Sequence, residues 1–100
     1  MSARFLSRAV LPTISYFYGI YIRMYVNEHP PPHFHAIYGE EVAYIDITSG
    51  DVIGGSLPRN ARRLVRQWVE LHREELEDNW RRIEQSLPPR KIEALDAHKG

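Results

Sequence analysis

The 100-residue sequence contains no cysteine and carries no excess charge of either sign. Without cysteine, the chain has no disulfide, no thiolate ligand for zinc and no cysteine nucleophile. Thirteen basic and thirteen acidic side chains balance one another, so the net charge provides no general attraction to nucleic acid or to anionic lipid. Electrostatic binding of such partners therefore requires a local group of charges.

Long apolar runs are missing as well. The most apolar stretch, residues 14–26, is interrupted by Gly19 and Arg23, whereas a membrane-spanning helix needs roughly 18 apolar residues in a row. The first eleven residues carry Arg4 and Arg8 and lack the apolar core of a secretory signal. These features predict a cytoplasmic protein with no membrane-spanning segment.

The composition is that of one folded domain. Hydrophobic residues make up 43% of the chain and charged residues 26%, close to the averages of globular proteins, and a chain of this length encloses a single core. We interpret residues 1–11 as an N-terminal extension and residues 12–87 as one α+β domain. Residues 88–100 are interpreted as a C-terminal tail that is frayed beyond Pro89.

Residues 12–55 are rich in β-branched and aromatic side chains, and several stretches alternate apolar with polar residues. This pattern predicts strands over residues 13–17, 20–26, 33–38, 41–47 and 52–53, with turns at Gly19 and Gly39. Residues 27–32 contain three prolines and form a stiff connection. Short connections favour antiparallel pairing, so we expect a small antiparallel sheet of four or five strands.

A long amphipathic helix is predicted from about residue 59 to residue 86, where Leu87-Pro88-Pro89 ends it. At about 100° per residue, Trp68, Leu76 and Ile83 fall in one apolar sector, with charged residues opposite. This apolar face is expected to pack on the sheet. The predicted fold is therefore α+β, with the sheet packed against one long C-terminal helix.

Three of the five histidines, His29, His33 and His35, lie within seven positions of one another. His33 and His35 share one face of the predicted strand, and side chains at this spacing lie about 6 to 7 Å apart. That separation lets two imidazoles bind one metal ion or one phosphate together. The opposing interpretation is that these are surface histidines that pack beside prolines without a function.

His72 lies near the middle of the apolar sector of the helix, where a polar ring needs a hydrogen-bond partner. If this face covers the sheet, His72 meets His33 or His35 in one cleft, with Glu75 and Asn79 at the margin to orient the rings. One imidazole as base and another as acid suit cleavage of an RNA phosphodiester. We therefore take His33, His35 and His72 as candidate catalytic residues. The alternative is that His72 is a core histidine bonded to a backbone carbonyl.

The spacing of His33, His35 and Glu40 is similar to the first half of the cupin metal motif. The glycines that flank that motif are absent at the required spacing, and its second half is missing. We therefore predict no cofactor. We also expect the purified protein to hold no stoichiometric metal, because two strand histidines lack a well-placed third ligand.

Four arginines lie within eight residues at the predicted helix start, where the helix dipole already presents partial positive charge. Helix N-termini and arginine side chains both bind phosphate, so this unfavourable arrangement indicates an anion-binding surface. The predicted nucleic-acid-binding residues are Arg59, Arg62, Arg63 and Arg66. The alternative is that these arginines are solvated or paired with carboxylates of the sheet.

Several of these segments together resemble a known bacterial family. They are Pro12-Thr13-Ile14-Ser15, Phe17-Tyr18-Gly19-Ile20, Met24-Tyr25, His29-Pro30-Pro31-Pro32-His33-Phe34-His35-Ala36, Leu57-Pro58-Arg59 and Trp68 to Trp80. The pattern is similar to that of the family called domain of unknown function 4160 over about residues 11–85, with the proline–histidine segment its most specific part. The resemblance implies one component of a toxin–antitoxin pair, with a small cognate partner protein encoded nearby.

Residues and resemblance together predict a toxin–antitoxin component that acts on or binds RNA, in its enzymatic form a metal-independent endoribonuclease. The alternative is a non-enzymatic antitoxin or regulatory module that binds a partner protein. A further alternative is a metal-dependent enzyme that uses the His33-x-His35 strand. Self-association into a homo-oligomer is a further prediction for partners.

Overall fold

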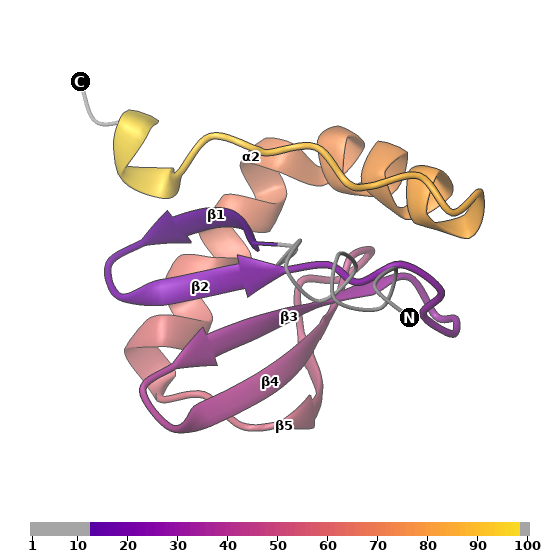
Figure 1. Ribbon diagram of the computed structural model, residues 1–100. Helices are drawn as coiled ribbons and strands as arrows, with labels where there is room; N and C mark the ends of the chain where they lie inside the picture. Colours follow the sequence, from indigo (N-terminus) through magenta and orange to yellow (C-terminus); the bar gives the residue numbers. More distant parts are fainter. Residues whose placement is uncertain (1–12, 99–100) are drawn as a thin grey trace, which may run out of the picture.

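The protein is described by a computed structural model over residues 13–98, so the predicted extension at residues 1–11 lies outside the described part. Five strands are followed by one long helix and a short 3₁₀ helix (Figure 1). They are β1 (Thr13–Phe17), β2 (Ile20–Arg23), β3 (His33–Tyr38), β4 (Glu41–Asp46), β5 (Val52–Gly55), α2 (Arg59–Glu84) and η1 (Leu95–His98). The α+β prediction is confirmed. Within residues 13–98, no helix combines the length and apolar character that a membrane crossing requires.

The strands form one sheet in the order β1-β2-β3-β4-β5, and each strand runs antiparallel to its neighbour. Residues Tyr18 and Gly19, with φ of 51° and 82°, connect β1 to β2. Two residues with positive φ are typical of the hairpin turn that matches the right-handed twist of paired strands. The predicted turn at Gly19 is therefore confirmed, and the chain continues as a simple antiparallel meander.

The core lies between α2 and one face of the sheet. Trp68, Leu76 and Ile83 are buried, as their shared helical sector predicted. The Trp68 ring packs against Phe17 at 5.3 Å and against Phe34 at 5.6 Å between ring centroids. Alternating residues of the strands thus supply one side of the core, and the apolar sector of the helix supplies the other.

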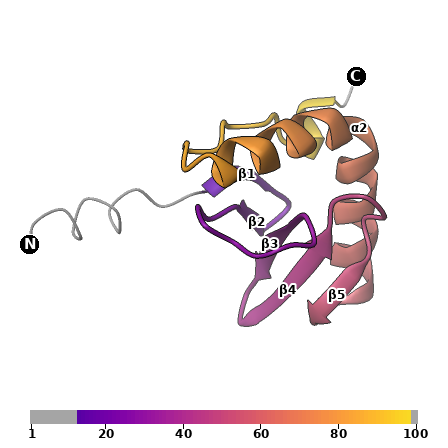
Figure 2. The same cartoon turned by 90° about the vertical axis from the view of Figure 1, so that its right-hand side faces the viewer.

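Helix α2 is not straight. His72 has non-helical backbone angles (φ −127°, ψ 22°), and the helix changes direction there. The half before His72 lies across one face of the sheet, whereas the half after it passes beyond the β1 edge (Figures 1 and 2). The second half of α2 therefore covers an end of the sheet that a straight helix would leave open.

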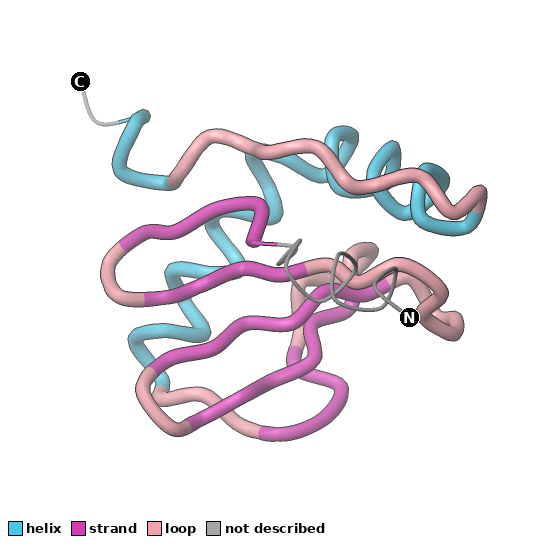
Figure 3. The backbone as a smooth tube through the Cα atoms, in the orientation of Figure 1, coloured by secondary structure: helices cyan, strands magenta, loops and turns pink. Residues whose placement is uncertain are grey.

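The segment after α2 runs back beside the second half of that helix and then meets β1 (Figure 3), and the prediction of a frayed tail beyond Pro89 is wrong for residues 90–98. The Ile92 side chain is buried, and its backbone N–H donates to the Ile14 carbonyl at 2.8 Å. The Trp68 indole N–H donates to the Glu93 carbonyl at 2.8 Å. Because these polar and apolar groups find partners in the domain, the segment belongs to the fold.

Candidate functional site

The sheet has one face covered by α2 and one face over which no described helix or strand lies (Figures 1 and 2). We call the second one the open face. Side chains that alternate with the core residues project from it, and its residues are Tyr16, Tyr21, Arg23, His33, His35, Ile37, Val42 and Tyr44. Tyr16, Tyr21 and Tyr44 each leave more than two fifths of their surface exposed. The open face is therefore aromatic along its middle and carries imidazoles at one end.

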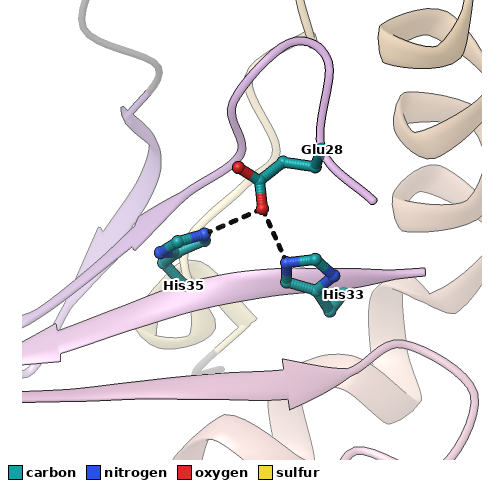
Figure 4. A group of neighbouring side chains, drawn as sticks. All are labelled: Glu28, His33 and His35. Carbon is teal, nitrogen blue, oxygen red and sulfur yellow. Dashed lines mark hydrogen bonds and ion pairs between the residues drawn. The ribbon is translucent and has the colours of Figure 1, made fainter. Parts of the chain in front are cut away.

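At that end, Glu28 from the β2–β3 connection meets both histidines of β3 (Figure 4). Glu28 Oε1 lies 2.8 Å from His33 Nε2 and 3.3 Å from His35 Nε2. The side chains are 26%, 11% and 15% exposed, respectively. We call these three residues the Glu28–His33–His35 group, and it is the one set of three His, Asp or Glu side chains among residues 13–98 whose ligand atoms lie close enough to share a metal ion.

Neighbouring groups hold both imidazole rings in place. The His33 Nδ1 lies 2.8 Å from the Pro31 carbonyl oxygen, which only accepts hydrogen bonds, so we infer that Nδ1 carries the hydrogen. The His35 ring lies between Tyr25 and Tyr44, with centroids 4.7 Å from each. These contacts leave the Nε2 atoms directed at the carboxylate.

This arrangement attracts positive charge. With Nδ1 of His33 acting as a donor, its Nε2 either carries a second proton or presents a lone pair to Glu28. A lone pair of His33 Nε2 and the carboxylate are favourable neighbours only with a proton or a metal ion between them, whereas His35 Nε2 can donate its own hydrogen to Glu28 in the neutral tautomer. The hydrogen bonds of His33 therefore make its contact with Glu28 a suitable place for a cation.

His72, the third predicted catalytic histidine, lies elsewhere. It is buried on α2, its Nδ1 is bonded to Glu75 Oε1, and its ring is 5.5 Å from that of Trp68. Trp68 packs on Phe34, a residue of the covered face, whereas His33 and His35 point to the open face. The structure does not bring His72 together with His33 or His35.

Glu75 does orient His72, as its position predicted, but Asn79 has another partner. The Asn79 side-chain amide donates to the Arg90 carbonyl at 2.9 Å and accepts from the Arg90 backbone N–H at 2.8 Å. Asn79 therefore fixes the segment after α2 and does not touch a histidine in any contact the described residues show.

The four predicted arginines are exposed at the start of α2 and line one surface pocket together with Asp51 and Val52 of the β5 side. Arg66 forms an ion pair with Asp51, which matches the alternative of pairing with a sheet carboxylate. The first turn contains no acidic residue, and the capping position, Pro58, provides no side-chain hydrogen bond. The arginine pocket is thus separate from the Glu28–His33–His35 group.

Glu28 is the residue that sequence reasoning missed. The carboxylate that the motif spacing indicated, Glu40, lies in the β3–β4 turn, at the opposite end of β3 from His33. The only sequence feature that points to Glu28 is its position just before the rigid proline segment, whose Pro30–Pro31 bond is cis. His29, next in the chain, is exposed and is not part of the group.

Comparison with known protein families gives a match. A family model described as "Domain of unknown function (DUF4160)" matches residues 19–81. The matched range contains β2 to β5 and most of α2, including every residue of the Glu28–His33–His35 group. No curated protein and no solved structure matches the chain.

Proposed function

The chain belongs to the DUF4160 family, and we propose that it is a toxin–antitoxin component that binds single-stranded RNA on the open face of its sheet. The observation that carries the proposal is the aromatic surface of that face. Unpaired RNA bases stack on exposed aromatic side chains, and a sheet that presents two or three of them is a recurrent RNA-binding surface.

The geometry of the tyrosines suits stacking. Tyr16 and Tyr21 lie opposite each other on β1 and β2, with ring centroids 4.6 Å apart. The Arg23 guanidinium carbon lies 5.6 Å from the centre of the Tyr21 ring, which places a cation beside the aromatic surface. Tyr44 on β4 extends this surface toward the β5 edge.

The helix-start arginines supply the phosphate contacts in this proposal. Tyr44 is paired with Gly54 of β5, the edge strand, and Val52 of the same strand lines the arginine pocket. A strand of RNA that leaves the open face over β5 therefore meets Arg59, Arg62 and Arg63. The tyrosines of the open face then stack on the bases of the RNA, and the arginines on the other side of β5 contact the phosphates of the same strand.

The contacts support binding over cleavage by two histidines. Acid–base cleavage requires one imidazole near the attacking hydroxyl and another near the leaving oxygen. In this chain the Nε2 atoms of His33 and His35 face the same carboxylate oxygen, and His72 is buried on the covered side. We therefore assign the histidines no acid–base role in the proposed function.

The binding test uses a labelled single-stranded RNA of about ten nucleotides and measures anisotropy at low salt. Tyr21→Ala and Tyr44→Ala are each expected to weaken binding about 5- to 150-fold, because a stacked base contributes about 1 to 3 kcal/mol. The matched control is Tyr38→Ala: Tyr38 is also an exposed tyrosine of the sheet, but its ring lies against Gly19 and its side chain alternates away from the open face. RNA binding that is undetectable, or that falls equally in all three variants, would exclude this function.

Toxin–antitoxin membership rests on the family resemblance, and growth measures it separately. The chain and the product of the neighbouring gene are expressed alone and together. We expect one of them to arrest growth and the other to relieve the arrest. Growth that is unaffected in all three conditions would remove the toxin–antitoxin part of the proposal and leave the RNA measurement unaffected.

A further inference from the structure

We propose that the Glu28–His33–His35 group binds one divalent transition-metal ion of the zinc class through one carboxylate oxygen and two imidazole nitrogens. This inference goes beyond RNA binding and does not depend on it. It replaces the expectation of a chain without stoichiometric metal, because Glu28 supplies the third ligand that the two strand histidines lacked in the sequence. The group differs from the motif spacing of the sequence, because Glu28 comes from the connection before β3 and not from the turn after it.

The spacing of the three candidate ligand atoms suits a metal ion. All of them lie within 4.8 Å of one another, and the two Nε2 atoms are 2.8 and 3.3 Å from Glu28 Oε1. Zinc ligands about 2.0 to 2.2 Å from the ion in a tetrahedral arrangement lie about 3.3 Å from each other. The His35–Glu28 distance already has this value, and the His33–Glu28 distance needs to open by about half an ångström.

The surroundings of the ligands are those that metal-binding histidines usually have. His33 Nδ1 donates to the Pro31 carbonyl at 2.8 Å, which orients Nε2 toward the site. Metal ligands characteristically hold the second ring nitrogen in this way. The His35 ring is held between Tyr25 and Tyr44, so neither imidazole has to reorient when the ion binds.

The nearest cationic side chain on the neighbouring strand does not compete for the carboxylate. Arg23 is paired with His35 in the register of β2 and β3. Its Nε donates to the Thr13 hydroxyl at 3.1 Å, across the strand pair on the side of β1 and away from β3. The negative charge of Glu28 is therefore available to a cation at the two imidazoles.

The donor set selects the class of ion. Imidazole nitrogen suits zinc, copper, iron and nickel, whereas magnesium and calcium prefer sites made of oxygen atoms. Two histidines and one carboxylate provide three protein ligands, and at least one coordination position stays open to water or to another ligand. Such a site resembles catalytic zinc sites in ligand count more than it resembles closed structural sites.

Zinc binding is measured by calorimetric titration of the untagged, metal-stripped full chain. We expect one equivalent to bind. Glu28→Gln and His35→Ala are expected to weaken binding at least about 10-fold, because each removes one of three ligands. His29→Ala is the matched control, since it removes a histidine from the same connection without touching the group, and it should bind zinc like the wild type. Magnesium should give no saturable signal.

Thermal melting separates metal binding from a purely structural role. Zinc should raise the melting temperature of the wild type and of His29→Ala, because a ligand of the folded state stabilises it, and should leave Glu28→Gln unchanged. If Glu28→Gln does not fold, saturation of the wild-type chain with Co²⁺ and the visible absorption of a four-coordinate ion replace this comparison. A wild type without saturable zinc or Co²⁺ binding, or a His29→Ala chain that loses it, would overturn the site.

The two proposals fail separately. Tyr21→Ala should weaken RNA binding about 5- to 150-fold and keep the zinc affinity of the wild type. Loss of zinc affinity in that variant would show that the open face, and not the Glu28–His33–His35 group, determines metal binding, and would also overturn the site.

Discussion

The two faces of the sheet draw on the same strands and differ in what the alternating side chains encounter. On β3, Phe34 and Ala36 have no exposed surface and pack beneath α2, whereas His33 and His35 on the open face stay partly exposed among tyrosines. The covered face supplies apolar burial, which is the dominant stabilising term of folding. The open face contributes little burial, so its aromatic and ionisable residues need another explanation, and ligand binding provides one.

Replacing Trp68 by Ala tests whether the covered face holds the core, and among the variants discussed it is expected to lower the unfolding free energy most. The variant should lose about 3 to 5 kcal/mol of unfolding free energy, because Trp68 is fully buried and its indole N–H is bonded to Glu93. Urea unfolding followed by circular dichroism measures the loss. Gln67→Ala, at the exposed neighbouring position, is the control and should stay within about 0.5 kcal/mol of the wild type. A loss below about 1 kcal/mol for the Trp68 variant would mean that the covered face is not the main core.

Ile92→Ala extends the comparison to the segment that follows α2. The side chain is 6% exposed, so its truncation should cost about 2 to 5 kcal/mol in the same urea measurement. Lys91→Ala, which is exposed next to it, should change stability by no more than about 0.5 kcal/mol. If both variants lose the same small amount of unfolding free energy, residues 90–98 do not pack on the domain, and the frayed tail predicted from the sequence is correct.

Tyr21→Ala probes the open face. It should cost about 1 kcal/mol or less, because a cross-strand pair such as Tyr16–Tyr21 contributes only that much at an exposed position. Thermal and urea unfolding measure this change, and the RNA affinity is measured on the same sample. A loss of unfolding free energy as large as that of the Trp68 variant would contradict the distinction between the two faces, because the open face would then be part of the core.

The double variant Arg62→Glu, Arg63→Glu is expected to have the smallest effect on stability and a clear effect on binding. Acidic residues are favoured at a helix start, so the unfolding free energy should rise by about 0.3 to 1 kcal/mol. Wild-type RNA affinity should fall with salt at a log–log slope of about −0.7 per phosphate, or about −2 to −3 for three or four arginines. The variant should flatten this slope. A steep slope that persists in the variant would place the phosphate contacts elsewhere.

Local patterns predicted most of the fold. Alternation located the five strands within a few residues, and the helical sector of Trp68, Leu76 and Ile83 identified the covered side. The bend at His72 was not predictable, because neither proline nor glycine occurs there. The packing of residues 90–98 depends on contacts with β1 and with Trp68, which are distant along the chain.

The candidate site was predicted in part. His33 and His35 were found from their spacing, but Glu28 was not, because a proline-rich connection has to fold back before its carboxylate meets β3. The sequence predicted that His72 would meet His33 or His35, and the alternation of side chains along β3 explains why it does not. Phe34 lies between the two histidines, so the part of α2 that holds Trp68 and His72 packs on the opposite side of the strand from His33 and His35. Helix α2 reaches His33 only farther along, where the Trp80 ring lies 5.5 Å from the His33 ring between centroids.

The segment after α2 also decides how this sheet interacts with other sheets. β1 would be an open edge, a template for pairing with another chain, but the Ile92 amide bonds to Ile14 on its outer side. The other edge, β5, has only four residues and ends in two glycines, so it offers a short template with few side chains to pack. Edge-to-edge pairing with another sheet is thereby disfavoured at both edges of this sheet.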